Sequence, residues 1–320
     1  MTFQVSRRLA AAALVLANFS AARAQAPAPA TGRRIAITID DGPVVGEMKD
    51  LARFQRIAAS ILESLQAEKI PATIFINERQ LNVPGQRDGR VAVLNNLLDA
   101  GYDLGNHTYS HPSINEIPLW QFEDNLVQGE VITRPLVEAH GRKLVWFRFP
   151  FLDCGKTPEV RRQFMDFLEQ HHYRIAPVTV DYKDYMFAGP YSRMMKAGRA
   201  EDAAKIRQAY LSVIDAEFEM AEKISKDLFG YELPQILLIH CSEMNSVSLR
   251  DSLAIMRKRG YSFITLEEAM ADPAYADLSH YKGEGGSWFD LTGDAIGKPV
   301  QDDAEGRVPK WVTELGRSSR

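Results

Sequence analysis

Short apolar runs alternate along this chain with longer segments of helical periodicity. The runs typical of strands are RIAITID (34–40), PATIFIN (71–77), YDLGNHT (102–108), KLVWFRFP (143–150), YRIAPVTVD (173–181), QILLIHC (235–241) and YSFITLEEA (261–269). Apolar residues with helical spacing predict amphipathic helices over 48–69, 90–101, 118–141, 158–172 and 248–260. This alternation predicts an α/β fold with a mainly parallel sheet of about seven strands. Periodicity alone does not distinguish an open doubly wound sheet from a closed barrel.

One segment interrupts this alternation before the strand at 235–241. Residues 188–234 are highly charged and helical in period, and they are too many for an ordinary connection. We interpret them as a helical insertion of two helices beside the site. The chain after residue 271 is Gly-rich and polar, so we expect 272–320 to form a loosely packed tail anchored by Trp288 and Trp311.

The N-terminus has the pattern of a secretory signal peptide. A basic start with Arg7 and Arg8 precedes an apolar centre and a small-residue site at Ala22-Arg23-Ala24. We expect cleavage after Ala24, a linker at 25–33, and a domain over 34–271 in an exported protein that is periplasmic or secreted. The alternative is an uncleaved anchor, but the apolar run is short for a bilayer, and we expect no stable membrane insertion.

Composition narrows the class of protein further. The 320 residues are 45% hydrophobic and 25% charged, which is typical of a globular protein with a sizeable core. A formal charge of −4 gives no indication of nucleic-acid binding. Only Cys154 and Cys241 are present, so the fold does not depend on a disulfide framework, although the two could form one bridge in an oxidising compartment. The oligomeric state is not indicated.

Ionisable residues follow most of the predicted strands. Ligands of α/β folds bind at the carboxyl ends of strands, so these residues are candidates for one site. They are Asp40, Asp41, His107, His111, Arg148, Asp181, Asp184 and His240.

The adjacent Asp40 and Asp41 pose an electrostatic problem, because two neighbouring carboxylates repel unless a cation or proton separates them. His107 and His111 share one face if their turn is helical. Alone, DDG is more often a turn and HxxxH more often two ordinary histidines. Together they predict a two-histidine, one-carboxylate metal site with open positions for water. One aspartate would bind the metal and the other would take a proton from the activated water.

Arg148, His240 and Phe151 extend this hypothesis. An unpaired guanidinium at the end of an apolar strand is costly, so Arg148 requires a carboxylate, and Asp40 is the obvious candidate. The alternative is that the ion pair of Arg148 is purely structural. His240 is either a core histidine or a general acid held by Asp184 or Asp181. We expect the Phe151 amide, after Pro150, to face the site as an oxyanion donor.

These residues resemble a known family. TIDDGP, HTYSH, RFPF, DYKDY and LLIH, in this order, resemble the five motifs of the polysaccharide deacetylases, carbohydrate esterase family 4. The resemblance covers roughly Arg34 to Met270, and the first two motifs are the most specific. It implies a distorted, incomplete (β/α) barrel.

The resemblance also implies roles for residues at these positions. Asp40 corresponds to the general base, and Asp41, His107 and His111 to the metal ligands. The ligand set favours zinc, with cobalt or nickel as alternatives.

Three further roles come from the later motifs. Arg148 would orient the base, His240 would be the general acid, and Asp184 would tune His240. The implied reaction is hydrolysis of an N- or O-acetyl group on an acetylated glycan.

The chain departs from the family pattern at substrate-binding positions. Tyr185 stands where the family usually has tryptophan, Phe151 replaces a common tyrosine, and 188–234 is absent from the minimal domain. A metal-dependent deacylase or amidase for a small non-sugar substrate is therefore an alternative, as is a non-catalytic glycan-binding protein. The sequence does not distinguish peptidoglycan, chitin, xylan or exopolysaccharide as the glycan.

Overall fold

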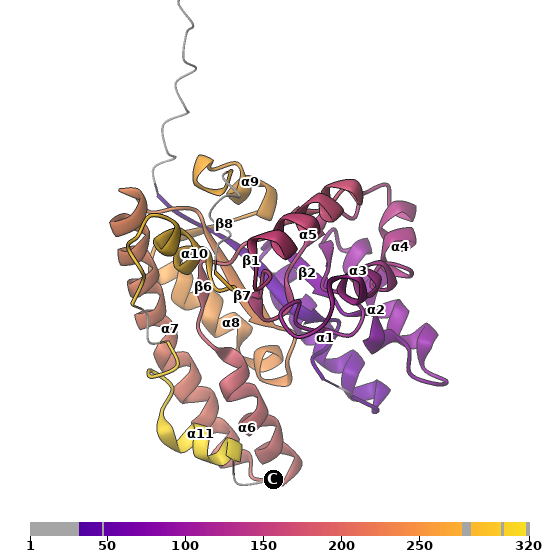
Figure 1. Ribbon diagram of the computed structural model, residues 1–320. Helices are drawn as coiled ribbons and strands as arrows, with labels where there is room; N and C mark the ends of the chain where they lie inside the picture. Colours follow the sequence, from indigo (N-terminus) through magenta and orange to yellow (C-terminus); the bar gives the residue numbers. More distant parts are fainter. Residues whose placement is uncertain (1–31, 47, 277–282, 302–303, 318–320) are drawn as a thin grey trace, which may run out of the picture. The chain divides into compact units, whose positions relative to one another are not determined.

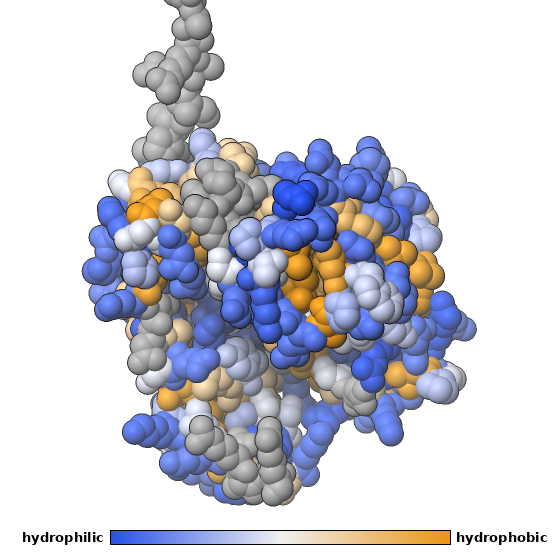
Figure 2. Space-filling model, viewed as in Figure 1, coloured by the Kyte–Doolittle hydropathy of each residue, from blue (hydrophilic) through white to orange (hydrophobic). Residues whose placement is uncertain are grey.

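The computed structural model describes residues 32–46, 48–276, 283–301 and 304–317 (Figure 1). The expected signal peptide and nearly all of the linker lie outside these residues. None of the helices in the described residues is long and apolar enough to cross a membrane. The face drawn in Figure 2 is mostly hydrophilic, with hydrophobic residues in separate patches.

The described strands are β1 (Arg33–Gly42), β2 (Ala72–Ile76), β3 (Asp103–Asn106), β4 (Trp146–Phe147), β5 (Arg174–Ile175), β6 (Val180–Asp181), β7 (Gln235–His240) and β8 (Tyr261–Ile264). The α-helices are α1 (Leu51–Ala67), α2 (Arg87–Asp99), α3 (Leu119–Gln128), α4 (Thr133–Ala139), α5 (Pro158–Gln170), α6 (Asp184–Lys196), α7 (Ala200–Phe229), α8 (Glu243–Lys258), α9 (Leu266–Met270), α10 (Trp288–Ala295) and α11 (Lys310–Arg317). Short 3₁₀ turns are η1 (Glu78–Leu81), η2 (Pro150–Leu152) and η3 (Pro273–Tyr275).

The central strand of the sheet is β1. The sheet order is β5-β4-β3-β2-β1-β7-β6, with β8 paired to the first residues of β1, and every strand pair is parallel. The middle of β1 is buried throughout, as expected for a strand covered on both faces. The predicted parallel α/β architecture is confirmed, with eight strands in the described residues where about seven were expected.

The expected single strand at 173–181 is divided into β5 and β6. Ala176 donates its amide to the carbonyl of Phe147 in β4, whereas Thr179 donates to the carbonyl of Ile236 on β7. Pro177 lies between them and has no amide hydrogen to offer. The chain therefore changes partners, from one end of the sheet to the other, within four residues. The two ends of the sheet are held close together, and the sheet curls into the incomplete barrel that the resemblance implied.

The prediction of one long helix over 118–141 is wrong. The structure has two helices there, because α3 ends at Gln128 and α4 begins at Thr133. Gly129 caps α3 at the point where it meets the loop after β3. A Cβ at Gly129 would lie 2.6 Å from the carbonyl carbon of Thr108. Glycine at this position therefore lets the end of α3 approach the backbone of the loop after β3 closely, and α3 ends at this contact.

Two helices, α6 and α7, occupy the segment expected to be an insertion, although α6 begins earlier, at Asp184. Buried residues of α7 recur with helical spacing, and α7 packs against α6, α8 and α10. The strand expected at 261–269 is β8 followed by α9, which Thr265 and Glu268 begin with a reciprocal capping box.

The tail is packed more tightly than expected. Trp288 is buried, as an anchor should be, but Trp311 is 41% exposed, and α11 instead buries Val312 beside α6. Cys154 and Cys241 are both buried and free, so the possible disulfide does not form.

Close packing at Gly129 can be tested by adding one methyl group. We expect Gly129→Ala to lower the free energy of unfolding by about 1–3 kcal/mol, because the loop after β3 must move. Urea unfolding monitored by circular dichroism measures the change. Gly189→Ala is the control: its Cβ would meet only the Arg193 side chain at 3.6 Å inside α6, and it should raise stability by up to about 1 kcal/mol. Equal stability of Gly129→Ala and the wild type would contradict this account.

Candidate active site

Backbone geometry at the end of β1 places Asp40 and Asp41 side by side. Successive side chains of a regular strand point to opposite faces. Asp41 has φ 57°, and the pairing of β1 with β2 is irregular between Ile39 and Gly42. Both carboxylates consequently approach the same atom, His107 Nε2, at 3.8 Å from Asp40 and 3.9 Å from Asp41.

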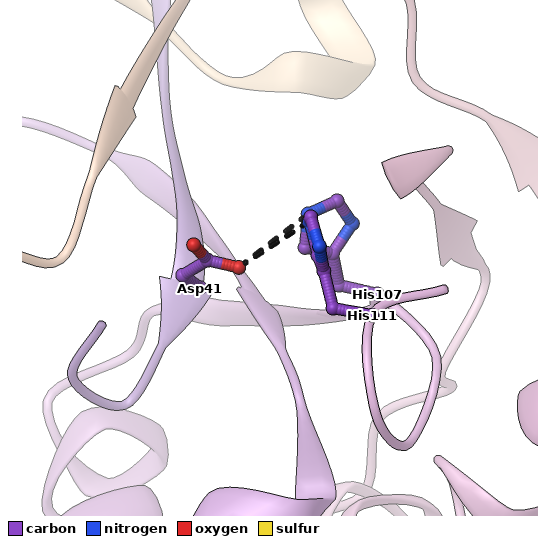
Figure 3. Close-up of side chains that lie close together, drawn as sticks. All are labelled: Asp41, His107 and His111. Atoms are coloured by element: carbon purple, nitrogen blue, oxygen red, sulfur yellow. Dashed lines mark ion pairs between the residues drawn. The ribbon is translucent and has the colours of Figure 1, made fainter. Parts of the chain in front are cut away.

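His107 and His111 meet through a loop rather than through the helical turn that would have placed them on one face. The segment after β3 is irregular, and Thr108 and His111 have positive φ of 65° and 60°. The two imidazole rings lie 4.7 Å apart, edge to face. His111 Nε2 is 3.5 Å from Asp41 Oδ1, and both rings face the Asp41 carboxylate (Figure 3).

These three side chains form a possible metal site. One candidate ligand atom from each of Asp41, His107 and His111 lies within 4.8 Å of the other two. His107 Nδ1 donates to the Arg148 carbonyl oxygen at 2.9 Å, because a carbonyl can only accept, so Nε2 keeps a free lone pair toward the cluster. Burial and neighbouring cations lower the pKa of His107 well below its usual value, which also keeps the ring neutral. The donor set therefore fits a divalent cation such as zinc.

Asp40 is buried beside the Arg148 side chain, as the sequence indicated. Arg148 Nη1 donates to both Asp40 oxygens at 3.3 Å, and Nη2 donates to Thr38 Oγ1 at 3.0 Å. Burial raises the pKa of Asp40 to about 6, although the Arg148 charge opposes this rise. Asp40 is therefore poised to exchange a proton near neutral pH.

His240 pairs with Asp184, which decides between the two aspartates left open by the sequence. His240 lies beside Asp40 in the β1–β7 register, and its Nδ1 is 2.6 Å from Asp184 Oδ1. Burial favours the neutral ring, but the Asp184 charge and hydrogen bond raise the pKa of His240 to about 10. Asp181 instead pairs with Lys183 Nζ at 2.7 Å.

Asn245 is a site residue that the sequence did not reveal. Its Nδ2 donates to Asp184 Oδ2 at 2.5 Å and to the His240 carbonyl at 2.9 Å, while its Oδ1 accepts from Tyr210 at 2.8 Å. Burial alone would raise the pKa of Asp184, but His240 and these hydrogen bonds lower it. An asparagine three residues after the N-cap Ser242 carries no local signal of this role.

Phe151 and Tyr185 lie at the edge of the site. Phe151 has φ 60°, is 64% exposed, and packs its ring against His111 with centroids 4.5 Å apart. Tyr185 is 48% exposed, and its ring centroid is 6.1 Å from that of His240. The Tyr185 hydroxyl donates to Glu305 Oε1 in the tail at 3.4 Å.

A single cavity of about 1240 Å³ is lined by Asp40, Asp41, His107, His111, Phe151, Tyr185 and His240. Its walls include α6 and α7, and also parts of the tail that the sequence had suggested were a loose wrap. The tail residues that line it are Gly286, Ser287, Phe289, Asp290, Val300, Ala304 and Glu305. The insertion and the tail therefore both shape the space in front of the candidate metal site.

Comparison with known proteins points to one family for the first half of the chain. The family model for polysaccharide deacetylase matches residues 28–174, a span that includes Asp40, Asp41, His107, His111 and Arg148. By this match, residues 28–174 are similar to the polysaccharide deacetylase family.

Two curated relatives are bacterial. A peptidoglycan-N-acetylglucosamine deacetylase of Bacillus cereus is 27% identical over 34% of this chain and 34% of its own length. The peptidoglycan-N-acetylglucosamine deacetylase PgdA of Listeria monocytogenes is 21% identical over 76% of this chain and 40% of its own length. The chain therefore spans well under half the length of these two relatives.

One solved structure shows the same fold. The chitin deacetylase of Colletotrichum lindemuthianum superposes with a TM-score of 0.52 at 21% identity, over 74% of this chain and 87% of the other.

The contact between Asp184 and His240 predicts the titration of that histidine. We expect Asp184→Asn to lower the pKa of His240 by about one to three pH units, because the charge that raises it is lost while burial remains. NMR titration of the imidazole without added metal measures this. Asp181→Asn is the matched control, and a larger fall in that variant would contradict the assignment.

Proposed function

We propose that this protein is a metal-dependent hydrolase that removes N-acetyl groups from amino sugars of a glycan. The observation that carries the proposal is the shared cavity. In it, a two-histidine, one-carboxylate cluster lies beside a buried aspartate and beside His240 of the neighbouring strand β7, which Asp184 at the start of α6 holds. This arrangement supplies a cation site, a base and an acid around one point.

The metal ligands would be Asp41, His107 and His111, with zinc favoured and cobalt or nickel as alternatives. A bound divalent cation would polarise the acetyl carbonyl and lower the pKa of a water.

The other residues divide the proton transfers between them. Asp40 takes a proton from the attacking water, and Arg148 holds the Asp40 carboxylate in place. The protonated His240 gives its Nε2 proton to the leaving nitrogen as the amide C–N bond breaks, while Asp184 holds Nδ1. The products are acetate and a free amine. The Phe151 amide would donate to the oxyanion as it forms.

The substrate class follows from the relatives and from the cavity. Two relatives are named for peptidoglycan N-acetylglucosamine, and a structural neighbour is named for chitin. The half-exposed Tyr185 ring beside His240 provides an apolar face on which a sugar ring can pack. Export to the compartment that contains such glycans is part of this proposal, and N-terminal sequencing of the mature protein tests it.

The two adjacent aspartates should respond differently to substitution. We expect Asp41→Asn to weaken zinc binding at least tenfold, because a charged ligand is lost. Asp40→Asn should retain zinc and lower kcat by about 100-fold or more, because the base is lost. Calorimetric titration with zinc and an acetate-release assay on chitooligosaccharides measure these effects. Equal loss of zinc in both variants would overturn the division of roles.

The wild-type protein tests the function itself. Acetate release should stop after chelation and return with zinc, and chelator-resistant turnover would contradict a metal-dependent mechanism. A panel of acetylated oligosaccharides and small amides separates the glycan substrate from a small non-sugar one. Binding of glycan without acetate release in the presence of zinc, cobalt or nickel would instead indicate a non-catalytic binding protein.

A further inference from the structure

Between β5 and β6 the chain changes its hydrogen-bonding partner. This leaves a gap in the strand pairing beside the active site, which we call the wedge. The chain leaves β4 after Ala176 and joins β7 at Thr179, so the segment following β4 loses its neighbour on that side. That segment contains Phe151 and Leu152, both with φ 60°. Non-glycine residues in this conformation persist only when their surroundings hold them.

Residues 284–288 of the tail, which we call the closing segment, fill this wedge. On one side, Cys154 donates its amide to the Glu284 carbonyl at 2.9 Å, and Gly286 donates to the Leu152 carbonyl at 3.1 Å. On the other side, Trp288 donates to the Val178 carbonyl at 2.6 Å. The closing segment therefore takes the place of the missing strand pairing at the open side of the barrel, and α10, which begins at Trp288, lies next to β6 (Figure 1).

Side chains fix the closing segment in this position. Asn115 Nδ2 donates to the Glu284 carbonyl at 2.8 Å, and Asn115 Oδ1 accepts from the Gly155 amide at 3.1 Å. Ser287 and Asp290 form a capping box at the start of α10, and the Trp288 side chain is buried. The segment thus has partners on the loop after β3, on the turn after β4 and on the connection between β5 and β6.

Gly285 permits this close approach. It forms an antiparallel bridge with Asp153 and has φ 153°, a conformation that favours glycine. A Cβ at Gly285 would lie 2.5 Å from the Leu152 carbonyl oxygen and 2.7 Å from the Asp153 Cα. Both of these atoms are backbone, so they or the closing segment would have to move.

We propose that the closing segment is a positioning element of the active site, with Gly285 as its positioning residue. The closing segment holds the turn at Phe151 and Leu152 so that the Phe151 amide faces the reacting carbonyl. The segment also forms one wall of the cavity. This inference rests on the proposed function for its kinetic consequence, but the coupling between the segment and the turn is independent of activity.

The variant Gly285→Ala tests the coupling directly. We expect faster hydrogen exchange in peptides covering residues 149–155, because the bonds to Leu152 and Cys154 are disturbed. We also expect kcat on an acetylated chitooligosaccharide to fall about tenfold or more with little change in KM, because an oxyanion donor acts in the transition state. A merely stabilising tail would lower the melting temperature without this split between kcat and KM.

Gly297→Ala is the matched control. Gly297 also lies in the tail with positive φ, 71°, but its added Cβ meets nothing within 4 Å. It should match the wild type in exchange over 149–155 and in kcat. If Gly285→Ala fails to fold, Asn115→Ala loosens the same segment without adding an atom, and it should change both readouts in the same direction.

The outcomes separate this inference from the proposed function. Unchanged exchange and unchanged kcat in a folded Gly285→Ala, or in Asn115→Ala if the first variant does not fold, would overturn the inference. Faster exchange with unchanged kcat would also overturn the positioning role. If the wild type releases no acetate from any substrate, the proposed function fails, and the exchange experiment still decides whether the segment holds the turn.

Discussion

The buried ion pair between Arg148 and Asp40 is the interaction on which the rest of the site depends. Both side chains are almost completely buried, so each charge requires the other, and removing one partner would leave an uncompensated charge in the core. Arg148 also lies over the Phe75 ring at 4.6 Å and accepts at its backbone carbonyl from His107. Arg148, which directly follows β4, therefore holds the Asp40 carboxylate of β1 and also orients His107, a candidate metal ligand after β3.

Strained backbone is concentrated around this pair. Asp41, His111, Phe151 and Lys183 all have positive φ and all line the same cavity. Each conformation costs free energy, and residues held in such conformations tend to cluster at functional sites. The neighbouring carboxylates of Asp40 and Asp41 illustrate the consequence, because a regular β1 would have sent one of them to the opposite face.

The helices α6 and α7 and the tail supply much of the wall of the cavity. Helix α6 begins with Asp184 and continues as a wall of the cavity, so the residue that holds His240 and the wall are parts of one element. The tail contributes the wall near Tyr185 and closes the wedge beside Phe151. These walls lie outside residues 28–174, the region that matches the family model.

The sequence by itself determined the parallel α/β architecture, the resemblance to a family, and a set of residues that the fold does bring to one cavity, because buried strands and ionic residues at their ends have a local pattern. Only the tertiary structure decided which residues far apart in the sequence are in contact. Asp184 rather than Asp181 holds His240, Gly129 divides one expected helix, and the strand at 173–181 changes partners. Asn245 and the closing segment gave no local signal, because their roles come from contacts between residues far apart in the chain. Periodicity reports which residues are buried, whereas only the folded chain shows which buried groups meet.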